Sequence, residues 1–225
     1  MKRIMSGALL VASLGLSGCA TAPFPRPEPF AATDLAPEEV PARFAARLAP
    51  RYELLQSLVF RIYWREIAAL GYVSVDRPAR SFAMACLNPL GIKLFELVGE
   101  RGEVSARFVA PEIEKYGGNL AQAAGADLMR AYFDGLPPAG AACRRAGGRL
   151  IFTAADETGR TEYRYAGRDG FLAEKVRIEG RRVCWKVEYR DYRLDADGWI
   201  PAGLVIHNRR YGYRLVAAAK EMEPK

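Results

Sequence analysis

Few side chains in this sequence have the types and spacing that catalysis requires. His207 is the single histidine and ends a predicted strand, where we expect a structural role rather than that of a general base. Asp195 and Asp197 are spaced like the first ligands of a calcium loop, but the later ligands do not follow. The GxSxG, HExxH and GxxxxGKS/T motifs are absent. We therefore expect a protein that is not an enzyme and needs no cofactor and no metal.

The cysteines are too far apart in the sequence to form a CxxC-type zinc site. Apart from Cys19 near the N-terminus, they are Cys86, Cys143 and Cys184, so at most one internal disulfide can form in an oxidising compartment. Unpaired, buried thiols that behave as small apolar side chains are favoured for Cys86 and Cys184 over a disulfide.

The residues Leu16-Ser17-Gly18-Cys19 have the pattern of a bacterial lipobox, in which the cysteine thiol receives a diacylglyceryl group. The apolar stretch before them follows two basic residues and is shorter than the ~20 residues that span a bilayer. Residues 1–18 are therefore predicted to be a lipoprotein signal peptide, cleaved before Cys19. Acyl chains of the palmitate type on Cys19 would then anchor the protein. The alternative is an ordinary secretory signal with a chance cysteine.

The segment that follows the signal peptide is predicted to be a spacer. Residues 19–37 contain five prolines among small and polar residues, a composition that favours an extended, polyproline-type tether. At ~3.1 Å per residue, such a tether holds the next domain up to roughly 50 Å from its lipid. Residues 38–225 are long enough for a single domain with a sizeable core. In bacterial lipoproteins, an aspartate directly after the lipidated cysteine is a signal for the inner membrane. Ala20 stands at this position, which favours the outer membrane.

The net charge of the full sequence is +7, with basic and acidic residues interspersed. This balance suits an anionic membrane surface. Because no stripe of lysines and arginines alternates with stacking aromatic residues, nucleic acid is not an expected partner.

Apolar residues recur with two different periods along the predicted domain. Val40, Phe44 and Leu48 have a spacing of four, which predicts a short helix. Beyond them the dominant period is two, as in residues 58–64 and 183–190, and this period is typical of half-buried strands. About eleven strands are predicted, and the short turns between them suit antiparallel hairpins.

One segment in mid-chain breaks the period of two. Asn119 is a predicted N-cap, Leu120, Ala124, Leu128 and Tyr132 form an apolar stripe, and a glycine and two prolines follow. This pattern predicts an amphipathic helix. Because a large antiparallel sheet must shield its apolar face, the expected fold class is mainly β (α+β). We expect an incomplete antiparallel β-barrel of about eleven strands, with an inserted helical lid that encloses an apolar cavity.

The turn Asn88-Pro89-Leu90-Gly91 carries a bulky apolar residue at its tip. Leaving a leucine in water forgoes roughly 1.5–3 kcal/mol relative to burying it. An outward-pointing Leu90 would therefore indicate a partner or a membrane. From the sequence alone, an outward Leu90 and one that folds back onto the sheet are equally supported.

Several blocks of the sequence together resemble a known family. They are the lipobox, the turn 87–91, the helix end 128–137 and the strand 185–189 before Ile200-Pro201-Ala202. In this order and spacing they are similar to the LolB family of outer-membrane lipoprotein receptors, over roughly residues 52 to 217.

The resemblance implies a chaperone-like role in protein transport. A half-barrel with a helical lid would accept the acyl chains of lipoproteins from a LolA-like periplasmic carrier and release the cargo into the outer membrane. Asn88, Pro89, Leu90 and Gly91 would form a membrane-insertion loop, with Leu90 as the protruding residue. The candidate cavity residues are the apolar ones of the predicted strands and helix, although plain core is the alternative for each: Phe60, Ile62, Trp64, Phe82, Met84, Phe95, Leu128, Tyr132 and Trp185.

The expected partners are a periplasmic lipoprotein carrier, its acylated cargo and outer-membrane lipid. The expected location is the periplasmic face of the outer membrane, where a monomer would be anchored at Cys19. Two alternatives remain: a protein of the same fold that carries another lipid or a glycolipid, and a non-catalytic adaptor of an envelope assembly. An open cavity favours carriage, whereas a filled core with a flat apolar patch favours an adaptor.

Overall fold

A computed structural model describes Phe24 and residues 36–115 and 120–220. The predicted signal peptide, Cys19, nearly all of the tether and the predicted N-cap Asn119 lie outside these residues. Among the described residues, no helix has the length and apolar character needed to cross a membrane.

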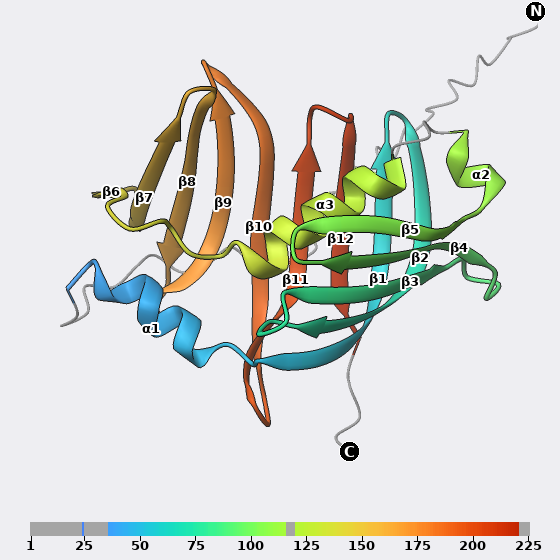
Figure 1. Ribbon diagram of the computed structural model, residues 1–225, viewed down its shortest axis with the longest axis horizontal. Helices are drawn as coiled ribbons and strands as arrows, with labels where there is room; N and C mark the ends of the chain where they lie inside the picture. The colour runs from blue at the N-terminus through green and yellow to red at the C-terminus, as the bar shows by residue number, and fades with distance from the viewer. Residues whose placement is uncertain (1–23, 25–35, 116–119, 221–225) are drawn as a thin grey trace, which may run out of the picture.

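The described part of the chain is built on one antiparallel sheet (Figure 1). Its order is β5-β4-β3-β2-β1-β12-β11-β10-β9-β8-β7-β6, so β5 and β6 are edges and the barrel is not closed. The strands are β1 (Arg51–Ile62), β2 (Arg65–Asp76), β3 (Ser81–Leu87), β4 (Lys93–Glu100), β5 (Glu103–Val109), β6 (Ala142–Ala146), β7 (Arg149–Asp156), β8 (Gly159–Ala166), β9 (Phe171–Glu179), β10 (Arg182–Asp195), β11 (Gly198–Asn208) and β12 (Tyr213–Ala219).

The predicted fold class is therefore confirmed, with twelve strands in the sheet instead of about eleven. The strand that the sequence did not reveal is β6. Four of its five residues are exposed, because an edge strand away from the core needs no apolar alternation.

The core follows from the period of two. In β1 buried and less buried residues alternate along the strand, so that Leu54, Leu58 and Phe60 lie on the inner face. Cross-strand partners extend this face, since Leu58 is opposite Ala69 of β2 and Phe60 is opposite Leu215 of β12. The sheet is strongly curved, and in Figure 1 the strands β3–β5 run across the view while β7–β12 stand upright.

Within the described residues, three helices accompany the sheet: α1 (Glu39–Arg47), α2 (Pro111–Glu114) and α3 (Leu120–Phe133). The short predicted helix is α1, which buries Val40 and Phe44. The Phe44 ring packs edge-on against Tyr165 and Tyr192, with ring centroids 5.8 and 6.0 Å apart, so α1 closes one end of the sheet.

The mid-chain helix is α3, which lies across the concave side of the sheet (Figure 1). It approaches the first half of the sheet closely: a Cβ at Gly125 of α3 would lie 2.4 Å from Cγ1 of Val104 in β5. A Cβ at Gly99 of β4 would likewise lie 2.7 Å from Sδ of Met129. These two glycines allow the helix backbone to rest almost directly on β4 and β5.

Candidate functional site

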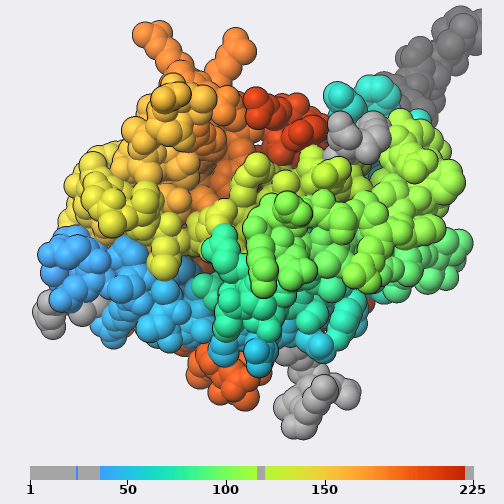
Figure 2. Space-filling model, viewed as in Figure 1, coloured from blue at the N-terminus to red at the C-terminus, as the bar shows by residue number. Residues whose placement is uncertain are grey.

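A cavity of about 950 Å³ lies between α3 and the second half of the sheet. The space-filling view shows this face of the molecule hollowed between the yellow-green α3 and the orange and red strands (Figure 2). The wall formed by α3 consists of Gln122, Ala123, Ala126, Arg130 and Phe133. The wall formed by the sheet and its turns includes Thr161, Tyr163, Lys175, Arg177, Glu179, Cys184, Trp185, Asn208, Arg210 and Tyr211.

Lys175 in β9 is the most buried cation of the cavity, with 5% of the residue exposed. Its Nζ donates hydrogen bonds to the main-chain oxygens of Asp134, at 2.7 Å, and Arg130, at 3.4 Å. The ammonium also lies 5.3 and 5.6 Å from the ring centroids of Tyr163 and Trp185. Burial lowers the pKa of Lys175 from 10.5 to about 8. Lys175 therefore keeps most of its charge at neutral pH inside an aromatic wall.

Trp185 adds a second polar group to this wall. The residue is buried, and its Nε1–H has no acceptor among the described residues. A buried donor without a partner is costly, and a ligand oxygen could satisfy it.

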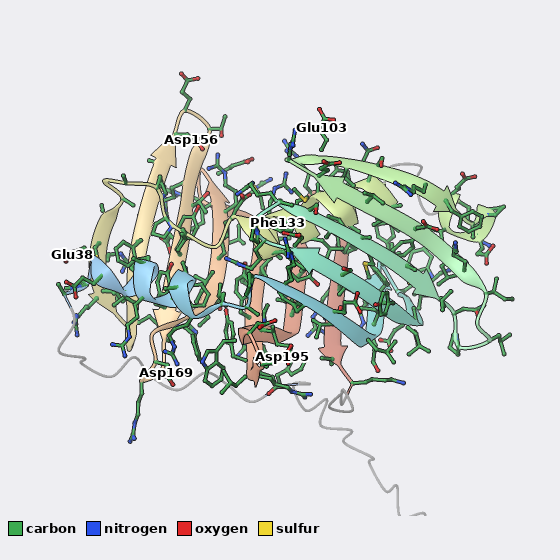
Figure 3. The ribbon with its side chains drawn as sticks, turned by 60° about the horizontal axis from the view of Figure 1, so that its bottom comes forward. Glu38, Glu103, Phe133, Asp156, Asp169 and Asp195 are labelled. Atoms are coloured by element: carbon green, nitrogen blue, oxygen red, sulfur yellow. The ribbon has the colours of Figure 1, made fainter. Side chains whose placement is uncertain are left out.

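Paired charges surround the cavity. Arg80 lies 2.8 Å from the carboxylate of Asp134, and Arg177 lies 2.7 Å from that of Asp156 on the β7–β8 turn. Figure 3 shows Phe133 between the two halves of the sheet, with Asp156 out on its turn. The cavity is thus amphipathic, with aromatic and alanine surfaces inside and charged groups around them.

The middle of α3 is tied to the sheet by a buried carboxylate. Asp127 is fully buried and accepts hydrogen bonds from Asn208 Nδ2 at 2.7 Å and from the Tyr213 hydroxyl. Its other oxygen accepts a bond from Arg130 at 2.8 Å. Burial and the adjacent Asp127 carboxylate raise the pKa of Tyr213, so the phenol stays a donor.

The C-terminal end of α3 is held by donors from distant strands. Arg77 donates to the Tyr132 carbonyl at 2.8 Å, and the Tyr189 hydroxyl donates to the Ala131 carbonyl at 2.9 Å. Together with Lys175, these groups satisfy the carbonyls that a helix leaves free at its end, where positive charge is also favourable.

The nine predicted cavity residues separate into three groups. Only Trp185 lines the large cavity. Seven others are buried but do not line it, and Phe60, Ile62 and Phe95 border a void of about 10 Å³, which is too small for an acyl chain. The other four of the seven are Phe82, Met84, Leu128 and Tyr132.

The expectation that Trp64 faces the interior is wrong, because 86% of it is exposed. The alternation of β1 stops at Ile62, and Trp64 belongs to the turn before β2. The turn reverses the chain, so the inward direction extrapolated from Phe60 and Ile62 no longer applies.

Sequence reasoning missed the polar residues of the cavity, above all Lys175 and Arg130. One signal was present: Lys175 and the adjacent Glu174 lie among the apolar residues of Phe171 to Ile178, a stretch in which most residues are buried. A lysine inside a buried strand is rarely without a specific role.

The predicted insertion loop is a tight turn with its apolar tip in solvent. Oδ1 of Asn88 accepts bonds from the backbone N–H groups of Leu90 and Ile92, both at 2.9 Å. Gly91 has φ 81°, a left-handed conformation that glycine adopts without strain. Leu90 is 84% exposed, so it does not fold back onto the sheet.

The remaining residues considered for chemistry are His207 and the cysteines. Cys86 is buried as expected, whereas Cys184 is only half-buried and lines the cavity, because it faces the hollow beside Trp185. His207 is half-buried and 3.8 Å from Glu188, and burial together with Lys186 lowers its pKa. Cys86, Cys143 and Cys184 are all free thiols, and burial raises the pKa of Cys86 to about 12. Among the described residues, no group of three or more histidine, cysteine or acidic side chains could hold a metal ion.

An open antiparallel sheet with a helix across its concave side defines a LolA-like fold, and comparison with solved structures supports this class. A LolA superfamily protein from Nitrosomonas europaea superposes with a TM-score of 0.53 at 10% identity, covering 85% of this chain and 94% of that one. A DUF1329 family protein from Desulfovibrio piger gives a TM-score of 0.52 at 7% identity, covering 82% and 90% of the two chains. No protein-family model and no curated protein sequence matches this chain.

Proposed function

We propose that this protein accepts the acyl chains of lipoproteins from a periplasmic carrier and inserts the cargo into the outer membrane, as expected for a LolB-type receptor. The observation that carries the proposal is the cavity of about 950 Å³ beneath α3, within the range of about 300–1,000 Å³ typical of ligand sites. The fold shared with a LolA superfamily protein agrees with this proposal.

The chemistry of the cavity suits an acylated cysteine. The faces of Tyr163, Trp185 and Phe133 offer apolar contact that does not depend on the exact shape of a chain. The ester and amide oxygens of such a cargo could accept bonds from Trp185 Nε1–H and from Lys175. If the cavity binds the chains less tightly than the bilayer does, their release to the membrane is downhill and needs no ATP.

Release requires proximity to the membrane. We infer that Leu90, held outward by the Asn88 turn, inserts among lipid headgroups and lowers the barrier to cargo transfer. In the proposed arrangement, residues 1–18 are removed, acylated Cys19 and the tether 19–37 keep a monomer at the periplasmic face of the outer membrane, and residues 38–225 form the receptor domain. The anchor would raise the local concentration of the domain at its target.

A second candidate is a carrier of another amphiphile with an anionic headgroup, such as a phospholipid. It is favoured by the cations of the cavity, since the Lys175 ammonium donates to neutral main-chain oxygens and Arg130 reaches the cavity from α3. Both candidates use the same hollow and differ in the group that occupies its polar part.

A transfer experiment separates these candidates. The mature chain from residue 19, with Cys19→Ser so that it cannot be acylated, is mixed with a carrier loaded with labelled lipoprotein. We expect the label to move to this protein, and an excess of phosphatidylglycerol to compete weakly. If no lipoprotein is accepted while phosphatidylglycerol binds, the second candidate replaces the first.

A further inference from the structure

The largest exposed aromatic side chain of the described residues lies at the tip of the β1–β2 hairpin. Trp64 is 86% exposed and the adjacent Tyr63 is 75% exposed, with their ring centroids 6.1 Å apart. Neither residue lines the large cavity or belongs to the buried core. Large aromatic rings in water are unfavourable, and a pair of them on one tip needs a reason outside the packing of the domain.

The backbone conformation at this tip is unusual for the residue types that occupy it. Tyr63 has φ 53°, a left-handed conformation that favours glycine or asparagine and that a bulky side chain seldom adopts. The tip therefore holds a tyrosine where turn chemistry alone would select a small or polar residue. Such strain is characteristic of functional positions.

A second turn stands beside the first and adds a third ring. Ile62 of β1 is paired with Tyr213 of β12, so the β11–β12 turn lies next to the hairpin tip (Figure 1). A Cβ at Gly212 would lie 3.6 Å from the Tyr63 ring. Tyr211 on this turn is 46% exposed and also lines the cavity. The rings of Tyr63, Trp64 and Tyr211 are called here the aromatic rim, which reaches the cavity through Tyr211.

Exposed basic residues lie beside the aromatic rim. The two turns carry four exposed arginines, Arg61, Arg65, Arg209 and Arg210, against one acid, Glu66, which pairs with Arg61 at 2.6 Å. The opposite end of the second half of the sheet differs, since the β10–β11 turn carries Asp195 and Asp197 (Figure 3). Trp and Tyr prefer the headgroup region of a bilayer, and clustered arginines are drawn to anionic lipid.

We propose that the aromatic rim and its arginines form a membrane-contact surface, separate from the Leu90 loop, that seats the cavity opening on the headgroups of an anionic bilayer. This inference rests on the proposed function and adds the orientation in which transfer occurs. Because Tyr211 and Arg210 belong both to the turn and to the cavity lining, a chain leaving the cavity beside them enters lipid without crossing water.

Vesicle binding without cargo tests this surface. The protein is the mature chain with Cys19→Ser, and the vesicles contain phosphatidylethanolamine with phosphatidylglycerol, or phosphatidylcholine alone. With the anionic vesicles we expect a blue shift of tryptophan emission and quenching by brominated lipid. We assign both to Trp64, because Trp185 is buried and Trp199 packs against Phe171 beside the distant β10–β11 turn. Flotation should be stronger on the anionic vesicles and weaken with added salt.

The decisive variant is Tyr63→Asn with Trp64→Ser, which suits the left-handed turn and so keeps the hairpin. We expect its partition onto anionic vesicles to fall roughly tenfold. The matched control, Leu194→Ser, removes an apolar side chain that is 68% exposed near the end of β10 and should leave binding unchanged. The proposal is overturned if the double variant floats like the parent, if the control loses as much, or if both vesicle types bind equally.

Acceptance of cargo in solution, measured on the same double variant, distinguishes the two proposals. Normal acceptance with lost flotation supports both the receptor function and the aromatic rim. If the parent protein floats with anionic vesicles in a way that depends on Trp64 but accepts no acylated cargo, the receptor function fails while the membrane-contact surface stands. If the parent protein accepts cargo but its flotation does not depend on Trp64, the membrane-contact surface fails while the receptor function stands.

Discussion

The side-chain amide of Asn208 in β11 donates a 2.7 Å hydrogen bond to the carboxylate of Asp127, which is fully buried in the middle of α3. The two residues are separated by 81 positions in the sequence. This contact joins the helix to the half of the sheet on which it does not rest directly. The width of the cavity therefore depends on a polar contact as well as on apolar packing.

Replacing Asp127 with alanine should destabilise the protein strongly. The change leaves Asn208 and Tyr213 buried without their acceptor, and we expect a loss of about 2–4 kcal/mol in the free energy of unfolding. Urea titration measures this loss. The control is Asp169→Ala, which removes a carboxylate paired with Arg47 at the surface and should cost less than about 1 kcal/mol. Equal losses in the two variants would contradict a structural role for the buried contact.

Lys175 should give the stability a characteristic dependence on pH. Its folded-state pKa of about 8 lies below the ordinary value of 10.5, so the unfolded chain binds more protons between these pH values. The free energy of unfolding of the parent, relative to Lys175→Met, should therefore rise between pH 8 and 10.5. The slope approaches about 1.4 kcal/mol per pH unit. Chemical denaturation of both proteins over this range measures it, and taking the difference removes the contributions of the buried tyrosines. A difference that stays constant with pH would be the contrary result.

Leu90→Glu should separate delivery from acceptance. A carboxylate at the tip of the Asn88 turn cannot enter the headgroup region cheaply, whereas the cavity is untouched. We expect cargo to accumulate on the variant and its insertion into vesicles to slow, with a stability change within about 0.5 kcal/mol. Leu194→Glu, at another exposed apolar position, is the control and should deliver normally. Unchanged delivery by the Leu90 variant would remove the loop from the mechanism.

Filling the cavity should block acyl binding. Ala126 faces the cavity from α3, and a tryptophan there would occupy space that an acyl chain needs. We expect the affinity of Ala126→Trp for a fluorescent fatty acid to fall at least about tenfold, as the chain loses buried contacts. Ala42→Trp adds the same bulk to an exposed position of α1 and should bind like the parent. Equal binding by both variants would show that the chain occupies another place.

The fold could be predicted largely because two periods govern it. Three patterns could be recognised in the sequence: the spacing in α1, the apolar stripe of α3 and the alternation of the longer strands. Each of these elements packs one face on the core, which produces a regular apolar pattern. The strand β6 was not, because an exposed edge has no such face. The β1–β2 turn was predicted too late, with Trp64 still in the strand, because Tyr63 and Trp64 are not among the usual turn residues.

The site was less predictable than the fold. An apolar pattern shows that Phe60 or Tyr132 is buried but not whether it borders a void, which depends on the curvature of the whole sheet. The polar part of the cavity brings together Lys175, Trp185 and the end of α3. These residues meet only through tertiary packing, so their spacing in the sequence carries no signature.

The open sheet also has a consequence for how the protein behaves among its neighbours. An unpaired edge strand is a template to which another chain can add, and this sheet has two such edges, β5 and β6. The β6 edge is short and carries Arg144 and Arg145, whose charge opposes the addition of a foreign strand. Neutral, β-branched residues at these two positions would turn the same edge into a seed for aggregation. The charged β6 edge thus allows the barrel to stay open, with access to its cavity, while it disfavours pairing with a strand of another chain.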